Sequence, residues 1–268
     1  MSTVATEPAH RTPKSVRVAL LAVIALGALA TVAQGTIALI DLAARHTTIE
    51  RQRFGGVRSI VIGDASDVRL TTAAAGAPLE VRTKLTEGLR KPSHDARVTG
   101  GGSLVLTSSC GWVVGNSCGV DYEVRVPAGT RVDVQGGAGD VRAEELRSSR
   151  PVRIEASSGD IDVAGVRAPA LRLHAGSGDI HASDVRAADV RAGGASGDVH
   201  VSLGGPADRL KAIASSGDVH LEVPDAVYRL DTAAGSGDVH AEAVRTSSGA
   251  RRSISGSTDS GDVHIAVR

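Results

Sequence analysis

Hydrophobic and polar residues alternate along residues 131–268 in a pattern that repeats about every 20 residues. Each repeat is centred on a Gly-Asp pair, which is preceded by Ser in six copies and by Ala in the first. The steps from one Asp to the next are 20, 19, 19, 20, 20 and 24 residues. We expect structural turns at Gly139, Asp140, Gly159, Asp160, Gly178, Asp179, Gly197, Asp198, Gly217, Asp218, Gly237, Asp238, Gly261 and Asp262.

The positions that flank each Asp predict two short strands per repeat. The residue one position after it is always Val or Ile, and the residue eight positions before it is always Val, Leu or Ile. Polar residues alternate with these apolar ones, as in period-2 strands with one buried face. Examples of the polar positions are Arg153, Arg172, Arg191 and Lys211.

The two apolar positions lie nine residues apart, an odd number, so a plain alternation would place them on opposite faces. A tight corner at Ser-Gly-Asp, with Gly free to take positive φ, absorbs the extra residue. Asp or Ser at such a corner can accept hydrogen bonds from nearby backbone amides. We therefore expect both strands of a repeat to face one core.

Two all-β architectures fit this pattern. One is a β-solenoid, similar to a parallel β-helix, and the other is an antiparallel β-sandwich. The near-constant repeat length favours the solenoid, with coils stacked in register about 4.8 Å apart. Each coil would then pack its Val or Ile against the equivalent residue of the next.

Residues 55–130 predict a less regular N-terminal β region with a cysteine loop. A degenerate repeat surrounds Asp67, and alternating segments follow it. Cys110 and Cys118 enclose a short loop that a disulfide can close, which indicates an oxidising compartment. Free thiols and a zinc site are the alternatives, but a zinc site needs two further ligands that no nearby residues supply.

Residues 18–40 contain no charge and are long enough to span a bilayer as one helix. The basic residues before this segment favour a cytoplasmic N-terminus, although the basic count after it is similar. We expect residues 1–15 to form a disordered cytoplasmic tail and the repeat array, residues 131–268, to be extracytoplasmic. A cleaved signal peptide is the alternative, with small residues near Ala30 and Ala33 as the cleavage site.

The 30 basic and 30 acidic residues balance, so no overall field attracts nucleic acid. Aromatic residues are almost absent, which disfavours carbohydrate binding by stacking. No sequence motif indicates a cofactor. The expected partners are the membrane, through residues 18–40, and a protein or envelope polymer.

The chained Ser-Gly-Asp-Val units resemble a domain-of-unknown-function family of bacterial β-strand-repeat proteins catalogued as candidate adhesins. The turn at residues 126–130, Val-Pro-Ala-Gly-Thr, belongs to the same resemblance. It covers roughly residues 55–268. It implies an extracytoplasmic β-repeat fold without known catalytic residues.

Two polar columns, meaning equivalent positions in successive repeats, are candidate sites. Asp side chains stacked about 5 Å apart would repel one another unless turn amides or a cation offset their charge. Calcium is the alternative to a structural role, but each corner offers one carboxylate. Two residues after the Asp, five repeats carry His, which we expect to be ordinary solvent-facing positions, with transition-metal or proton binding as the alternative. These are His181, His200, His220, His240 and His264.

Ser, His and Asp recur identically in each repeat, whereas an active site needs one distinct constellation. We therefore expect a non-catalytic, membrane-anchored surface protein that acts as a structural or adhesin-like interaction module. An envelope sensor working through a membrane partner is one alternative. An enzyme that acts on polysaccharides, as some β-helix proteins do, is the other.

Overall fold

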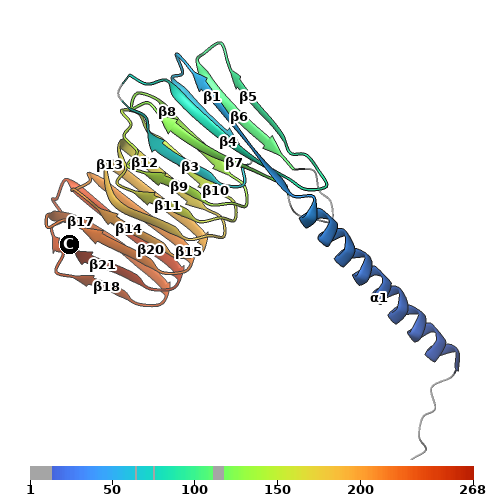
Figure 1. Ribbon diagram of the computed structural model, residues 1–268. Coiled ribbons are helices and arrows are strands. Elements are labelled where there is room, and N and C mark those ends of the chain that lie inside the picture. The colour runs from blue at the N-terminus through green and yellow to red at the C-terminus, as the bar shows by residue number, and fades with distance from the viewer. Residues whose placement is uncertain (1–13, 64, 75, 111–117) are drawn as a thin grey trace, which may run out of the picture.

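The computed structural model describes residues 14–63, 65–74, 76–110 and 118–268 (Figure 1). Helix α1 (Lys14–Ala43) projects away from a stack of β-strands. It begins four residues before the predicted span, and most of the predicted tail lies outside the described residues. Only Ala44 and Arg45 separate α1 from the first strand.

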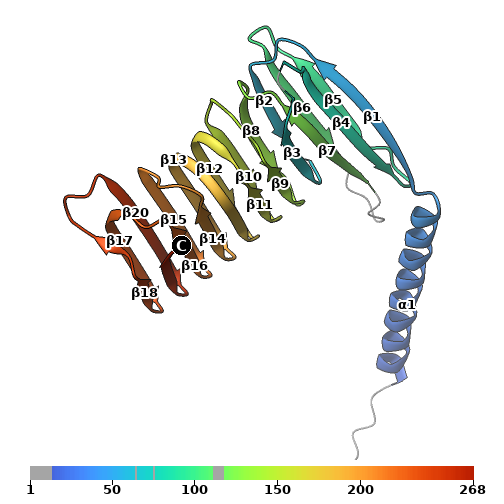
Figure 2. The same ribbon diagram turned by 60° about the vertical axis from the view of Figure 1, so that its left-hand side comes forward.

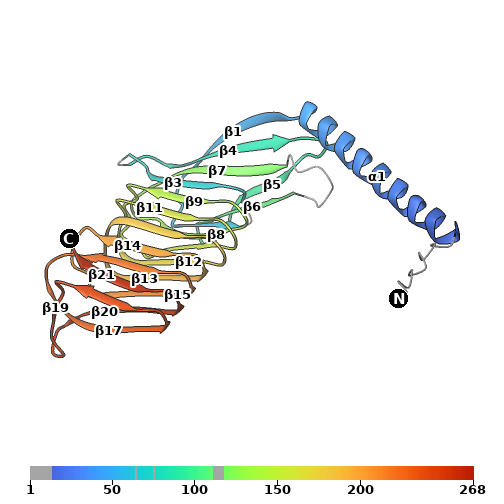
Figure 3. The same ribbon diagram turned by 90° about the horizontal axis from the view of Figure 1, so that it is seen from below.

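The strands form two rows, which we call sheet A and sheet B, and their buried faces pack against each other (Figures 2 and 3). In stacking order, sheet A contains β1 (His46–Phe54), β4 (Leu79–Glu87), β7 (Gly119–Val126), β3 (Val68–Thr72), β9 (Val141–Glu144), β11 (Ile161–Ala164), the first part of β13 (Ile180–Ser196), β14 (Val199–Leu203), β16 (Val219–Val223), β21 (Val263–Val267) and β18 (Val239–Glu242).

Sheet B follows the same order of coils. It contains β5 (Ser93–Val98), β6 (Ser103–Ser109), β2 (Ser59–Gly63), β8 (Arg131–Gly136), β10 (Val152–Ala156), β12 (Arg167–Ala175), the second part of β13, β15 (Arg209–Ser216), β20 (Arg252–Ser260), β17 (Val227–Ser236) and β19 (Arg245–Thr246).

Within the array every strand pair is parallel, and the pairs are in register apart from one shift between β13 and β14, which confirms the solenoid. Val199, for example, pairs with Val219, and Leu210 pairs with Ile254. The antiparallel sandwich is therefore wrong for this part of the chain. The predicted inward columns form the core: the residue after the corner Asp is fully buried in six of the seven repeats. The exception is Val239, which is 41% exposed because β18 is the last strand of its sheet.

The N-terminal end of the stack is built differently. β2 and β3 form the degenerate coil around Asp67, and they pair in parallel with β8 and β9. The segment between them adds the antiparallel pairs β1–β4, β4–β7 and β5–β6. These strands cover the first coil, so its apolar side chains Ile60, Ile62 and Leu70 are fully buried.

The coils do not stack in sequence order at the C-terminal end. The last coil, β20–β21, pairs with β15–β16 on one side and with β17–β18 on the other. The sixth coil is therefore outermost and the seventh is inserted beneath it. The loop that carries β19 gives the chain the extra length to return, which accounts for the 24-residue step.

Candidate functional site

The corner glycines are required because successive coils approach very closely at this point. A Cβ atom on Gly159 would lie 2.0 Å from the carbonyl oxygen of Gly139, and one on Gly178 would lie 2.2 Å from that of Gly159. Gly197 and Gly217 also take the predicted positive φ, as do Gly237 and Gly261. The glycines of the first three corners do not take positive φ. The close approach of neighbouring backbones is therefore the reason for glycine that applies to all seven corners.

The corner Asp residues form a continuous column of hydrogen bonds, which we call the aspartate ladder. The Oδ1 atom of each Asp accepts a hydrogen bond from the backbone amide of the next Asp in the stack, at 2.8–3.1 Å. In stacking order the ladder contains Asp67, Asp140, Asp160, Asp179, Asp198, Asp218, Asp262 and Asp238. The donor is thus an amide of the neighbouring coil, rather than one within the same turn. These seven bonds offset the repulsion between the carboxylates.

The two substitutions Asp198→Asn and Asp198→Ala separate the hydrogen bond from the charge. In Asp198→Asn the side-chain oxygen still accepts the hydrogen bond from the Asp218 amide, and the substitution removes one of the like charges. We therefore expect the free energy of unfolding to change by less than about 0.5 kcal/mol. Ala leaves that amide without its acceptor, and we expect a loss of about 1–2 kcal/mol. Urea denaturation of the two variants measures the difference. Equal midpoints for Asn and Ala would show that the ladder bond contributes nothing.

Five His side chains form a second column on the outer surface of sheet A, the histidine ladder. Their rings are stacked with centroids 4.7–5.3 Å apart and interplanar angles of 10–26°. The order is His181, His200, His220, His264 and His240, because the last coil is inserted before the sixth. At the N-terminal end the same column continues with Asp162 and Arg142, which are ion-paired at 3.3 Å.

His200 lies between His181 and His220 in this ladder, and its environment disfavours the charged ring. Partial burial lowers its pKa below the usual 6.5, and the neighbouring His181 and His220 lower it further, while Glu222 opposes them. Among the described side chains, no group of three or more His, Cys, Asp or Glu is placed to hold a metal ion. Metal binding by these His residues stays the alternative hypothesis, and its test is part of the pH experiment below.

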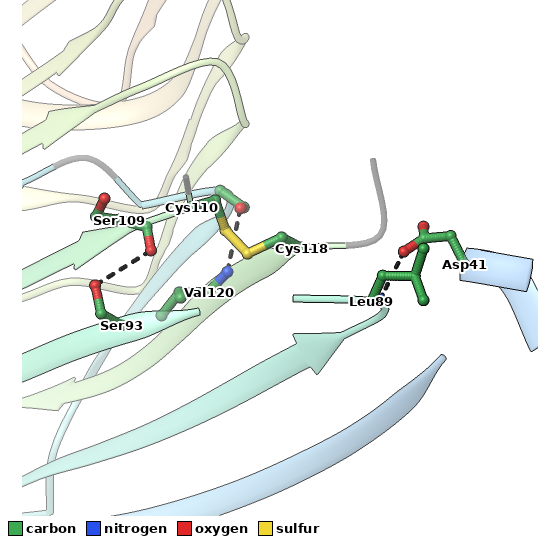
Figure 4. The surroundings of a disulfide bond; sticks show 8 residues. Asp41, Leu89, Ser93, Ser109, Cys110, Cys118 and Val120 are labelled. Carbon is green, nitrogen blue, oxygen red and sulfur yellow. Dashed lines mark hydrogen bonds between the residues drawn. A yellow bond between two sulfur atoms is a disulfide. The ribbon is translucent and has the colours of Figure 1, made fainter. Parts of the chain in front are cut away.

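Cys110 and Cys118 are joined by a disulfide, with their Cα atoms 5.8 Å apart (Figure 4). The loop between them lies outside the described residues. Near this end of the stack, the carboxylate of Asp41 accepts a hydrogen bond of 2.7 Å from the amide of Leu89. Asp41 is 3% exposed, so the end of α1 is held against the loop that follows β4.

The outer surface of sheet B carries the polar positions predicted between the inward columns. Arg153, Arg172, Arg191 and Lys211 are in register on four neighbouring strands. The sequence indicates that these side chains point outward. It does not show that a hollow lies beside them, lined by Gly193, Ile213 and Ser255 among others. No periodic signal marks that hollow.

Comparison with known proteins agrees with this geometry. The chain matches the Toastrack DUF4097 family over residues 64–268. The chain belongs to the Toastrack family. This confirms the resemblance to a domain-of-unknown-function family and the solenoid-like all-β fold. No curated protein matches.

Solved structures are similar to this Toastrack chain over most of their length. One, described as a candidate adhesin from Parabacteroides distasonis, is 15% identical, with a TM-score of 0.53, and covers 82% of this chain and 97% of its own. Another candidate adhesin, from Bacteroides fragilis, is 14% identical, with a TM-score of 0.49, and covers 83% and 97%. At such identities the likeness to the first structure establishes the fold alone.

Proposed function

We propose that this Toastrack protein is a non-catalytic, membrane-anchored surface protein whose β-array is an adhesin-like interaction module. The N-terminus would lie in the cytoplasm and the array outside the cell membrane. The observation that carries this proposal is the apolar helix that leads directly into β1. Leu26–Ala43 has a mean hydropathy of 1.6 and is long enough to cross a membrane, by length and composition.

The surroundings of this helix support an anchor. Large apolar side chains such as Leu26, Leu29 and Leu39 are more than 60% exposed, which is costly in water and favourable in lipid. Figure 1 shows α1 leaving from the end of the stack that carries β1, far from the C-terminal coils. The array would therefore extend away from its attachment point and present both outer faces to the surroundings.

The outer faces support a role in binding rather than catalysis. Their polar residues recur in columns, as in the aspartate and histidine ladders, so each potential Ser, His and Asp combination is repeated from coil to coil. A catalytic site needs one arrangement with distinct roles for its residues. The family and the solved structures of this fold are consistent with an interaction module.

Reporter fusions test the proposed topology. We expect alkaline phosphatase fused after Arg268 to be active, because that enzyme matures only outside the cytoplasm, and green fluorescent protein at the same position to be dark. The opposite pattern would reject export. N-terminal sequencing of the mature chain provides the second measurement. A mature N-terminus near Thr31 or Gln34 would keep export but replace the anchor with a signal peptide.

A further inference from the structure

The outer surface of sheet B carries a row of cations along the stacking direction. Arg153, Arg172, Arg191 and Lys211 lie side by side on β10, β12, β13 and β15. Neighbouring strands are about 4.8 Å apart, so the four positions span about 14 Å. Arg153 is paired with Glu155 on its own strand. Within the described part of the chain, Arg172 and Lys211 have no ion-pair partner.

A hollow of about 550 Å³ opens beside this row, over β12, β13, β15 and β20. It exists because Gly193 has no side chain where β12 has His174 and β15 has Ile213 in register. A Cβ atom on Gly193 would contact only the His174 ring, at 3.4 Å. Glycine is therefore not needed here for packing, in contrast to the corners, and its effect is to leave room on the surface.

The side chains around the hollow combine three kinds of chemistry. Arg191, Arg209 and Lys211 supply positive charge. Ser253 and Ser255 on β20 add hydroxyl groups, and Ile213, which is 37% exposed, adds an apolar surface. The insertion of the last coil places these serines beside β15, where the sixth coil would otherwise bring Arg229 and Asp231.

Asp189 positions two of the cations. Its Oδ2 atom accepts hydrogen bonds from Arg191 on the same strand at 3.3 Å and from Arg209 on the neighbouring strand β15 at 3.4 Å. The Asp189 side chain is only 16% exposed. One carboxylate therefore orients two guanidinium groups and leaves a net positive charge at the surface. Arg groups held in this way retain free N–H donors that suit a carboxylate or phosphate.

We propose that this hollow and the adjoining cation row bind an acidic glycan, a linear sugar polymer with repeated carboxylate or phosphate groups. The cations would contact its anions, the serines its hydroxyl groups and Ile213 its apolar ring faces. The row follows the stacking axis, which suits an extended polymer rather than a compact ligand. Tyr228, the one aromatic residue of the repeats, is buried, so recognition would be polar rather than by stacking. This proposal deepens the proposed function, since an envelope polymer reaches the hollow only if the array is exported.

Calorimetric titration of the full chain with tetragalacturonate tests the proposal. The chain would be held in a polyoxyethylene detergent, which contains no sugar, and the fully methyl-esterified tetramer would serve as the uncharged ligand. We expect binding of the acid that weakens as salt is added, and none of the ester. Tetraphosphate ions and a glycerol phosphate oligomer distinguish the anion from its carrier. Binding of the glycerol phosphate oligomer but not of tetragalacturonate would assign phosphate as the anion. Tetraphosphate that binds as tightly as tetragalacturonate or the glycerol phosphate oligomer would overturn the role of the hydroxyl groups.

Two variants locate the site. Replacing the cations in R172Q/R191Q/K211Q should weaken binding about tenfold or more. Gly193→Leu fills the hollow without changing charge and should weaken binding similarly. The control R51Q/R69Q/R125Q removes three charges from the outer surface of sheet A and should bind normally. Equal weakening by this control, or normal binding by Gly193→Leu with an unchanged melting temperature, would overturn the proposal. The topology reporters are independent of these titrations, so an exported chain that binds neither oligomer would reject this proposal alone.

Discussion

Replacing Gly217 by Val should lower the free energy of unfolding by roughly 3 kcal/mol or more. Two costs combine at this position. The backbone has a φ of +130°, which residues with a side chain rarely adopt. A Cβ atom would also lie 2.3 Å from the backbone oxygen of Gly197 in the coil beneath. Val also lowers the conformational entropy of the unfolded chain, which offsets only about 0.4–1 kcal/mol of this cost. The urea denaturation midpoint measures the result.

Two matched substitutions serve as controls. Gly249→Val places the same side chain in the loop after β19, where the nearest atom to a new Cβ is 3.9 Å away. His220→Thr changes an exposed residue three positions after Gly217. Both should change the free energy of unfolding by less than about 0.5 kcal/mol. A midpoint for Gly217→Val equal to that of either control would show that the corner needs no glycine.

The sequence was sufficient to predict the coils because each of their features is local and repeated. The buried positions of β15 and β16, such as Leu210 and Val219, follow from alternation around one Ser-Gly-Asp corner. The predicted phase shift across that corner is confirmed, since both residues are buried. The degenerate coil around Asp67 was also recognisable, and Asp67 accepts the Asp140 amide at 3.0 Å as the first member of the aspartate ladder.

The order of the coils was not predictable from the same pattern. Every coil presents Val or Ile directly after its corner Asp, so the pattern does not tell whether β21 packs on β16 or on β18. In the structure it pairs with both. The longer last step was the only sign that the chain leaves and returns. Alternation likewise does not distinguish parallel from antiparallel neighbours, so the antiparallel pairing of β4 and β7 was not foreseen.

The candidate sites differ in the same way: one follows from a repeated local pattern and the other does not. The histidine ladder was predictable because a column of identical residues in a parallel stack must lie side by side. The hollow on sheet B was not, because it depends on which residue is absent from a column. Gly193 looks like any outward residue in the sequence. Only the structure shows that His174 and Ile213 lie on either side of Gly193, so that its missing side chain leaves a hollow.

The histidine ladder should make the array less stable as the pH falls through about 6.5. His200 has a lowered pKa in the folded protein, since burial and the neighbouring His181 and His220 outweigh Glu222. The carboxylates of the aspartate ladder lie two residues earlier in each coil, at the corner before the strand, and like Glu222 they favour the charged ring, against this shift. The unfolded chain then binds protons more tightly than the folded one, so acid favours unfolding. The loss begins near the unfolded pKa of about 6.5 and is complete below the folded pKa.

Thermal melting of the full chain at pH 7.5 and 5.5 measures this effect. The comparison is a variant with His181→Thr, His200→Thr, His220→Thr, His240→Thr and His264→Thr, which keeps β-branched outward residues but cannot titrate there. We expect acid to lower the melting temperature of the natural chain more than that of the variant, by about 2–4 °C for each kcal/mol lost. An equal fall in both proteins would show that the ladder is not the group responsible. Nickel at pH 7.5 should leave both proteins unchanged, because we expect these His side chains to be ordinary solvent-facing residues. A nickel-dependent rise confined to the natural chain would instead establish a metal site on the ladder, because a ligand that binds only the folded state raises its melting temperature.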